Sequence, residues 1–268
     1  MINSVLKALD IMQSFSTIEP RLSLKEISSK LTLPKSTTHS LLKTLQSRGF
    51  IEQTDDGRYS LGTSVISLTQ SVRVNVELRD RSAPLLRQLA DSVRASAYLT
   101  VREDDKVVYV YAVESPQRLQ ARTAVGDRGH MHSTSVGKAI LSVLPESEVL
   151  GILSRTGLPQ FTDCTITRVE DLMAELVESR RRGYALDRGE NEENTYCVGA
   201  PIFDDRGRVI GACSISGADP EIAQRRAPEF ASRVMPAAQE ASRRMGYVPS
   251  RMSDVAWAEP VLQEAYQR

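Results

Sequence analysis

The sequence predicts an α+β protein with an N-terminal winged helix-turn-helix and a C-terminal antiparallel sheet covered by helices. Three observations predict this fold: helical periodicity followed by a hairpin within residues 1–62, a helical connector after them, and period-two strands alternating with helices in the rest of the chain. The 268 residues suit about two domains. We expect a first domain over residues 1–62, a linker helix over 63–79 and a second domain over 80–247, and we assign no role to the tail, 248–268.

Composition excludes several classes of protein. Lys and Arg together number 34, as do Asp and Glu, so the net charge predicts no anionic partner and a case for nucleic acid must rest on local geometry. The apolar runs fall short of the roughly 20 residues that a membrane-spanning helix needs. No secretory signal is visible, and three cysteines cannot form a complete disulfide set. We therefore expect a cytoplasmic protein with free thiols and no membrane contact.

Residues 1–48 contain the pattern of three helices. Apolar residues recur at three- and four-residue spacing from Ile2 to Phe15, which predicts the first helix. Ser23 and Glu26 form an S-x-x-E capping box that begins a short second helix. Pro34 suits the first position of a third helix, which Gly49 ends. The third helix should bury Thr38, Leu41, Leu42 and Leu45.

The outer face of that third helix carries short hydroxyls, an imidazole and ammonium groups, which can reach phosphates and base edges in a major groove. A hairpin that turns at Asp55-Asp56-Gly57 would follow as the wing. The alternative is a small helical subdomain with a solvated polar face. The candidate DNA contacts are Lys35, Ser36, Thr37, His39, Ser40 and Lys43 on the helix, and Arg58 at the hairpin tip.

The second domain alternates strands and helices. We expect strands over residues 96–102, 106–114, 118–125, 197–203 and 208–216. We expect helices over residues 133–144, from Pro145 onward, over 168–182 with Gly183 as its end, and over 228–245. Antiparallel hairpins covered by helices are typical of an α+β sensor-like domain.

The last hairpin predicts which side chains share a face. A turn at Asp205-Arg206 would pair Cys197 with Ser214 and Thr195 with Ser216. Residues two apart on a strand point the same way, so Cys197, Ser214 and Ser216 should share one face. A thiol and two hydroxyls could orient a small polar ligand there. The alternative is a core patch whose serines are satisfied by the backbone.

Two further features could supply ligand contacts. The helix that begins within residues 133–138 offers free N–H groups and a partial positive charge to a carboxylate or phosphate, although it lacks the spacing of a nucleotide loop. An ordinary Ser/Thr cap is the alternative. The segment with Asp187, Glu190, Glu192 and Glu193 shows neither helical nor strand periodicity, so we expect most of these acids to be solvated.

Several segments together resemble the IclR family of transcriptional regulators. In the first domain these are VLKALDI at 5–11, LPKSTTHSLL at 33–42, GFIE at 49–52 and YSLG at 59–62. In the second they are HSTSVGKAIL at 132–141, RGYALD at 182–187, CVGAPIFD at 197–204 and VIGACSISG at 209–217. The resemblance spans about residues 3–247, in order and in both domains.

The resemblance implies a GAF-like effector domain behind the winged helix. It implies a cytoplasmic homodimer or tetramer that binds palindromic double-stranded DNA. Such a protein would repress a catabolic operon and sense a small organic acid, such as a sugar acid or an aromatic acid. It implies no cofactor, no metal and no enzyme activity. The implied effector contacts are the backbone at Ser135 and Val136 and the side chains of Asp187, Cys197, Ser214 and Ser216.

This sequence departs from the family pattern at two places. Thr38 stands where an aliphatic residue is common. The segment after Asp187 lacks the usual acidic pair, which leaves the acidic contact open between Asp187 and Glu190.

The competing class is a cysteine-dependent hydrolase or a metal enzyme fused to a DNA-binding domain. It would use Cys197 with His130 or His132, but no spacing supplies the orienting third group of a hydrolase or a C-x-x-C or H-E-x-x-H motif for a metal. A DNA binder without an effector would not need a separate domain of this size.

Overall fold

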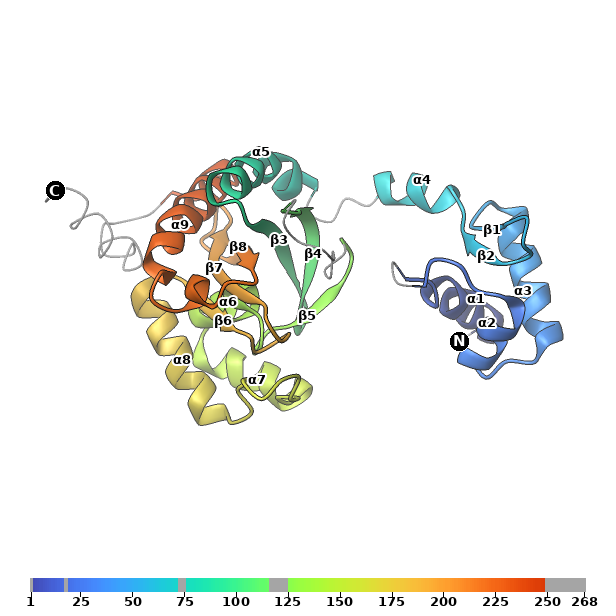
Figure 1. The fold of residues 1–268 in the computed structure, drawn as a ribbon, viewed down its shortest axis with the longest axis horizontal. Coiled ribbons are helices and arrows are strands. Elements are labelled where there is room, and N and C mark those ends of the chain that lie inside the picture. Colours follow the sequence, from blue (N-terminus) through green and yellow to red (C-terminus); the bar gives the residue numbers. More distant parts are fainter. Residues whose placement is uncertain (1, 17–18, 72–75, 116–124, 249–268) are drawn as a thin grey trace, which may run out of the picture. The chain divides into compact units, whose positions relative to one another are not determined.

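The computed structural model describes residues 2–16, 19–71, 76–115 and 125–248. The chain divides into two units, residues 1–74 and 75–268 (Figure 1). Within the described ranges, no helix combines the length and the apolar character that crossing a membrane would require.

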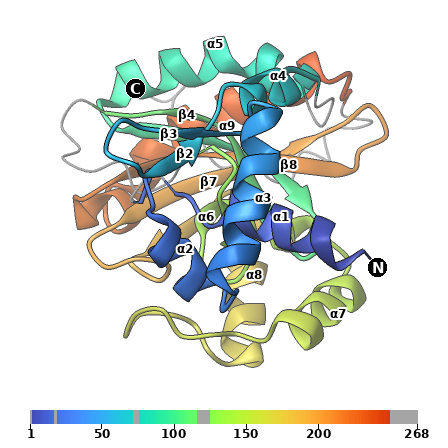
Figure 2. The same cartoon turned by 90° about the vertical axis from the view of Figure 1, so that its right-hand side faces the viewer.

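The N-terminal unit contains the three predicted helices and the predicted hairpin. Its elements are α1 (Asn3–Gln13), α2 (Leu24–Lys30), α3 (Lys35–Ser47), β1 (Ile51–Gln53), β2 (Tyr59–Leu61) and α4 (Ser64–Ser71). The capping box is formed: Glu26 N–H donates to Ser23 Oγ at 3.3 Å, and Ser23 N–H donates to Glu26 Oε2 at 2.7 Å. Helix α3 packs against both α1 and α2 (Figure 2). The winged helix-turn-helix prediction is therefore confirmed.

Helix α1 differs from the expected pattern of burial. Within the N-terminal unit it buries Ile11, but Ile2 is 70%, Val5 52%, Leu6 40% and Leu9 49% exposed. The periodicity correctly identified an apolar stripe, and the first part of that stripe has no cover within this unit. Exposed apolar faces of this kind mark interaction sites.

The C-terminal unit is one six-stranded antiparallel sheet with helices on both faces. Its strands are β3 (Ser96–Glu103), β4 (Lys106–Val113), β5 (Arg128–His130), β6 (Ala185–Arg188), β7 (Tyr196–Phe203) and β8 (Val209–Gly217), in the order β5-β4-β3-β8-β7-β6. Its helices are α5 (Val76–Val93), α6 (Ser135–Val143), α7 (Glu146–Thr156), α8 (Val169–Arg182), the 3-10 helix η1 (Pro220–Ala223) and α9 (Ala227–Arg244).

The observed elements differ from the sequence expectations at three places. The sequence did not predict strands β5 and β6 or helix η1. The strand expected over 118–125 lies almost wholly outside the described residues. The range expected for the linker helix, 63–79, contains α4 and the beginning of α5, and residues 72–75 between them are outside the described part.

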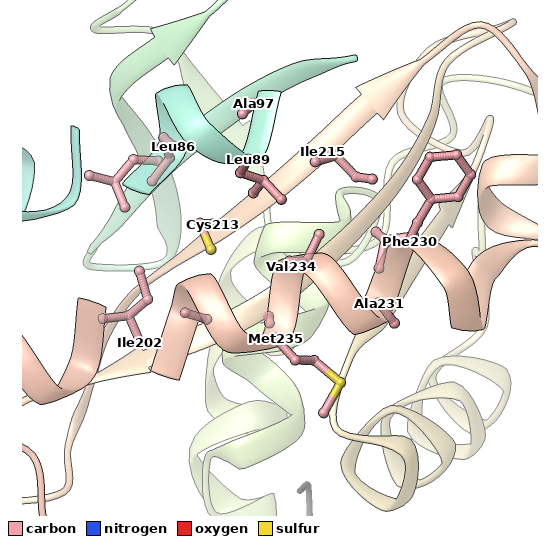
Figure 3. Close-up of a cluster of buried hydrophobic side chains, with 14 of the residues drawn as sticks. Leu86, Leu89, Ala97, Ile202, Cys213, Ile215, Phe230, Ala231, Val234 and Met235 are labelled. Carbon is pink, nitrogen blue, oxygen red and sulfur yellow. The ribbon is translucent and has the colours of Figure 1, made fainter. Parts of the chain in front are cut away.

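The two sheet faces carry different cores. Helices α5 and α9 cover one face, and α6 covers the other, with α8 packed against α6 (Figure 1). The first core contains Leu86 and Leu89 of α5, Cys213 and Ile215 of β8, and Phe230 and Val234 of α9 (Figure 3).

The β7–β8 hairpin corrects the predicted pairing. Cys197 lies opposite Ser216, and Gly199 lies opposite Ser214, so the predicted pairs Cys197–Ser214 and Thr195–Ser216 are wrong. The loop is one residue longer than expected, because Asp204 N–H donates to the carbonyl of Arg208. A bulge beside Ile202 shifts the register by one more residue. The two shifts add up to an even number, so Cys197, Ser214 and Ser216 still share a face.

Helix α6 begins directly over this face. A Cβ atom at Gly199 would lie 2.9 Å from the carbonyl carbon and oxygen of Ser135, closer than real Cβ contacts come. Only glycine therefore lets the start of α6 rest on β7. This contact brings the N-terminus of α6 to the face that carries Cys197, Ser214 and Ser216.

Candidate functional site

A row of polar side chains crosses the sheet on its α6 side. Asp187 lies opposite Cys197, Cys197 opposite Ser216, and Ser216 opposite Ser96, so four adjacent strands each contribute one residue. We call Asp187, Cys197, Ser216 and Ser96 the polar row. The Cβ atoms of such partners are typically about 4.5–5.5 Å apart. In the neighbouring row Ser214 lies opposite both Gly199 and Tyr98.

Ser214 and Ser216 are each 3% exposed, and their hydroxyls form no hydrogen bond with any described residue. Buried polar groups normally have a partner. The hydroxyl oxygen of Ser82, by contrast, is both enclosed and unpartnered in the described chain. Ser214 and Ser216 do not share this combination, because their unpartnered hydroxyl oxygens are not fully enclosed. A ligand or water can therefore reach them.

The N-terminus of α6 adds backbone donors to the same place. Thr134 caps the helix, because Gly137 N–H donates to its Oγ1 at 3.1 Å. The N–H groups of Ser135 and Val136 come first in the helix and donate to no described residue. They lie at the positive end of the helix dipole and can receive an anion.

The acidic segment after β6 is more buried than the sequence suggested. Asp187 and Glu190 are each 2% exposed, Glu192 is half-buried, and only Glu193 is exposed. The expectation that most of these acids are solvated is therefore wrong. The reason is a partner distant in sequence: Lys138 Nζ of α6 lies 2.6 Å from both carboxylate oxygens of Glu190, and its side chain is fully buried.

Threonines from a separate loop hold the turn that carries Glu190. Thr162 Oγ1 donates to the carbonyl of Gly189, and Thr165 Oγ1 donates to that of Glu190, both at 2.6 Å. Ser133 Oγ donates to Asn191 Oδ1 at 3.0 Å. Sequence reasoning missed these residues, and it missed the role of Lys138. A lysine within an otherwise apolar helix was the available signal, since a buried lysine requires a partner.

Asp187 occupies the edge of the polar row, and no cationic side chain of the described residues forms an ion pair with it. Its Oδ1 accepts the N–H of Glu190 at 2.8 Å. Burial raises the pKa of Asp187 to about 7, the Lys138 ammonium opposes this shift, and the Glu190 carboxylate adds to it. Near neutral pH this carboxyl group is therefore present in both its protonated and its ionised form.

The residues of the enzyme alternative lie in different surroundings. His130 and His132 pack edge to face, with ring centroids 5.7 Å apart, and His132 Nε2 lies 3.1 Å from the carbonyl of Pro159. Burial lowers the pKa of both histidines. Cys197 lies in the polar row between Asp187 and Ser216. Across the described ranges, no three His, Cys, Asp or Glu residues are grouped so that they could hold a metal ion.

The third helix presents the face that the sequence predicted. Thr38 and Leu42 are buried, Leu41 and Leu45 are half-buried, and Thr38 Oγ1 donates to the carbonyl of Pro34 at 3.1 Å, which satisfies its hydroxyl in the core. Its outer residues Lys35, Ser36, His39, Ser40 and Lys43 are exposed, and Thr37 is half-buried.

Arg58, expected to contact the DNA backbone from the hairpin tip, forms an ion pair within the N-terminal unit. Its Nη2 lies 2.9 and 3.1 Å from the two carboxylate oxygens of Glu26, the same carboxylate that caps α2. A phosphate would therefore have to compete with Glu26 for this guanidinium group.

The raised pKa of Asp187 predicts an unusual pH dependence of stability. The folded protein holds this proton more tightly than the unfolded chain, whose Asp pKa is about 3.9. Between that value and pH 7, the contribution of Asp187 to the free energy of unfolding therefore falls as pH rises, by about 1.4 kcal/mol per pH unit. Asp187→Asn removes the titrating group and keeps an oxygen that can accept the Glu190 N–H. The variant should gain about 3 kcal/mol relative to the parent between pH 5 and pH 8, measured by urea denaturation followed by circular dichroism.

Asp204→Asn is the control for this measurement. Burial raises the pKa of Asp204, but hydrogen bonds from Arg208 and Arg206 outweigh it and hold the pKa below the ordinary value. Asp204 is thus ionised in both states from pH 5 to pH 8, and its substitution should have the same effect at both pH values. An equally constant effect for Asp187→Asn would contradict the assignment of its pKa.

Comparison with known proteins matches both units. The family models "IclR helix-turn-helix domain" and "Bacterial transcriptional regulator IclR C-terminal" match residues 4–55 and 70–243. The transcriptional regulator XynR of Escherichia coli is 32% identical over 248 residues, which cover 92% of this chain and 98% of XynR. The transcriptional repressor IclR of Escherichia coli is 29% identical over 242 residues, which cover 89% of this chain and 88% of that protein.

A solved structure shows the same fold. The IclR homologue of Microbacterium hydrocarbonoxydans, determined as a complex with 4-hydroxybenzoate, superposes with a TM-score of 0.79 at 22% identity, and the match covers 90% of this chain and 98% of that one. The relatives are regulators and not enzymes. This chain, with both family domains in the same order, therefore belongs to the IclR family of DNA-binding transcriptional regulators.

Proposed function

We propose that this regulator is a cytoplasmic repressor of a catabolic operon, released from a palindromic operator by a small organic acid that binds between the polar row and the N-terminus of α6. The observation that carries the proposal is the pair of buried hydroxyls, Ser214 and Ser216, that have no partner among the described residues. The repressor named IclR among the relatives and the 4-hydroxybenzoate complex of the homologue support this reading.

The contacts for such an acid follow from the charges around the site. The N–H groups of Ser135 and Val136 would receive its carboxylate, because Lys138 is already bound to Glu190. Ser214, Ser216 and the Cys197 thiol would contact the body of the ligand. Asp187 would accept from a ligand hydroxyl. Glu190, the other acid left open by the sequence, would act indirectly, by holding Lys138.

Removing both hydroxyls should abolish the response without affecting DNA binding. Each neutral hydrogen bond contributes about 0.5–1.5 kcal/mol and each bond to a charged group about 1.5–3 kcal/mol. Ser214→Ala with Ser216→Ala should therefore weaken binding of the acid by about tenfold to a few hundredfold. Calorimetry measures this with the acid found by a thermal-shift screen of sugar and aromatic acids, and fluorescence anisotropy measures operator binding.

Ser154→Ala is the matched control, because this serine is exposed on α7 and donates to the carbonyl of Gly151. Its affinity for the acid should equal that of the parent. Equal affinity in the double variant too would place the ligand elsewhere.

We infer that α3 enters the major groove. Its exposed face carries Ser36, His39, Ser40 and Lys43, with Thr37 beside them, and the Thr38–Leu42 side holds it against the core. Ammonium groups on this face would contact phosphates, and hydroxyl and imidazole groups would contact base edges.

Substitutions on α3 should separate these two roles. Lys43→Ala should weaken binding to operator and scrambled duplexes alike and reduce the salt slope by about one, as loss of a phosphate contact does. Thr37→Ala and His39→Ala should instead change which bases are preferred. Fluorescence anisotropy over a range of salt concentrations measures both effects.

Lys30→Ala is the control for Lys43, because Lys30 already pairs with Glu19 at 2.7 Å and donates to the carbonyl of Ser14. It should leave the salt slope unchanged. Full affinity of a Thr37/His39/Lys43 triple alanine variant for both duplexes would exclude α3 from recognition.

We infer that the protein acts as a homodimer or tetramer. A palindromic operator presents half-sites about 34 Å apart, so it needs two winged helices. The exposed stripe of Ile2, Val5, Leu6 and Leu9 on α1 is a surface that a second copy could cover, and Ile66 and Leu68 of α4 are also exposed.

Charges on the α1 stripe should weaken this association. Val5→Glu with Leu9→Glu should lower the mass seen by light scattering at low micromolar concentration toward the 29.7 kDa of one chain, and should lower operator affinity. Val177→Glu, at a 63% exposed position on α8, is the control and should change neither quantity. A parent protein that is monomeric with and without DNA would rule out the proposed assembly.

A further inference from the structure

The wing of the N-terminal unit is joined to the chain segment that leads into α2. Leu22, just before α2, forms an isolated antiparallel bridge with Tyr59 of β2, and the two residues exchange backbone hydrogen bonds of 2.9 and 2.7 Å. Arg58 directly precedes Tyr59 and is thereby placed beside the start of α2. In a helix-turn-helix, the first helix crosses the phosphate backbone while the second lies in the major groove. Arg58 therefore belongs to the part of the unit that approaches the DNA backbone.

Glu26 binds the Arg58 side chain with both of its carboxylate oxygens. Arg58 Nη2 lies 2.9 Å from Oε1 and 3.1 Å from Oε2. Oε2 also accepts the N–H of Ser23 at 2.7 Å, so the capping box anchors this carboxylate to the start of α2. Hydrogen bonds from Ser23, together with the Arg58 guanidinium, hold the pKa of Glu26 below its ordinary value. Glu26 is therefore ionised at neutral pH and acts as a counter-charge for Arg58.

The main chain of Arg58 is fixed, while its side chain remains in contact with water. Its N–H donates to Asp56 Oδ1 at 3.3 Å, and its carbonyl accepts the N–H of Thr54 at 2.8 Å. The side chains of Arg58 and Glu26 are 41% and 47% exposed. Ion pairs with this exposure contribute little to stability. Rotation of the Arg58 side chain can therefore break the pair without any rearrangement of the wing.

The ion pair reduces what Arg58 can contribute to DNA binding. Non-specific affinity depends on the number of phosphates that Lys and Arg side chains neutralise. A guanidinium group that already faces a carboxylate adds little to this number. A phosphate placed beside the intact pair would also be repelled at short range by the charge of Glu26. Arg58 can neutralise a phosphate fully only after it has left Glu26.

We propose that Glu26 is a positioning residue that keeps Arg58 from binding the DNA backbone, so that the N-terminal unit binds non-specific DNA with one phosphate contact fewer than its basic residues would allow. This inference rests on the proposed entry of α3 into the major groove, which brings α2 over the backbone. It assigns Glu26 a role beyond the capping of α2. Non-specific sites compete with the operator for the regulator, so withholding this contact leaves more of the protein free to find its operator.

Glu26→Gln tests the proposal on the full chain with a scrambled DNA duplex. Glutamine also serves in a capping box, so the start of α2 is retained while the counter-charge of Arg58 is removed. Binding to the duplex should tighten about two- to tenfold at about 0.1 M salt. The slope of log K against log salt concentration should become steeper by about 0.9, the value for one additional phosphate contact. Fluorescence anisotropy from about 50 to 200 mM salt measures both quantities.

Glu19→Gln is the matched control. Glu19 lies in the same unit, and its carboxylate is 2.7 Å from Lys30 Nζ in an ion pair of similar exposure. The variant changes the net charge by the same amount, but Lys30 Nζ still donates to the carbonyl of Ser14 at 3.1 Å. It should therefore leave the salt slope unchanged. Thermal unfolding, followed by circular dichroism, checks that each variant is folded.

Arg58→Ala supplies the second test. In that background Glu26→Gln should leave the salt slope unchanged, because the cation that it would release is absent. An increase of the same size there would show direct repulsion between Glu26 and DNA and would overturn the proposal. An unchanged slope in Glu26→Gln alone, or an equal change in Glu19→Gln, would overturn it as well.

The Lys43→Ala variant separates this inference from the proposed function. If Lys43→Ala reduces the salt slope while Glu26→Gln leaves it at the parent value, the α3 interface stands and only the inference on Glu26 fails. If neither substitution changes the slope, both fail.

Discussion

The buried ion pair between Lys138 and Glu190 is the interaction on which the geometry of the effector-type domain depends. A fully buried ammonium group requires a counter-charge, and both oxygens of Glu190 provide it at 2.6 Å. Such a pair contributes little net stability compared with an apolar replacement, but loss of one partner costs about 3–5 kcal/mol because a buried charge remains. The ion pair fixes the turn after β6 to α6. It thereby holds Asp187 at the edge of the polar row.

The same pair determines the electrostatics of the proposed site. Because Lys138 is bound to Glu190, the described residues on this face of the sheet offer hydroxyls, a thiol and carboxyl groups, and the start of α6 adds positive potential. No cationic side chain in the described ranges forms an ion pair with Asp187, and burial raises its pKa. Recognition must then rely on matched hydrogen bonds, and a ligand with the wrong pattern of donors leaves buried groups unpaired.

The sequence predicted local features well and long-range contacts poorly. Periodicity and the capping box were sufficient for α2, α3 and the wing, because their signals lie within a few residues. The prediction that Cys197 and Ser216 share a face is correct, although the partner predicted for each was wrong. Two single-residue shifts of the register preserve the alternation of side chains along a strand. Strand β6 is too short to show alternation. The burial of Glu190 depends on a residue 52 positions away.

The exposed stripe on α1 shows a related limit. Periodicity identifies an apolar face but not what covers it, and only the structure reveals that Ile2 and Val5 lie outside the core of the N-terminal unit. The Tyr98–Glu114 contact is of the same kind. The Tyr98 hydroxyl on β3 donates to Glu114, the residue that follows β4, and no local sequence pattern links the two.

A continuous stretch of chain connects the proposed site with the segment that leads to the DNA-binding unit. Ser96 and Tyr98 follow α5 after a short turn, and α5 runs back 18 residues, about 27 Å, to Val76. Arg81 near the start of this helix and Arg244 at the end of α9 each donate to the backbone carbonyl of the other, so the beginning of α5 is tied to the body of the domain. A ligand can act on the operator only by favouring one arrangement of the two units, and it must therefore contact some element differently in the two arrangements. Strand β3 is suited to this role, because it carries Ser96 of the polar row and follows α5 after a short turn.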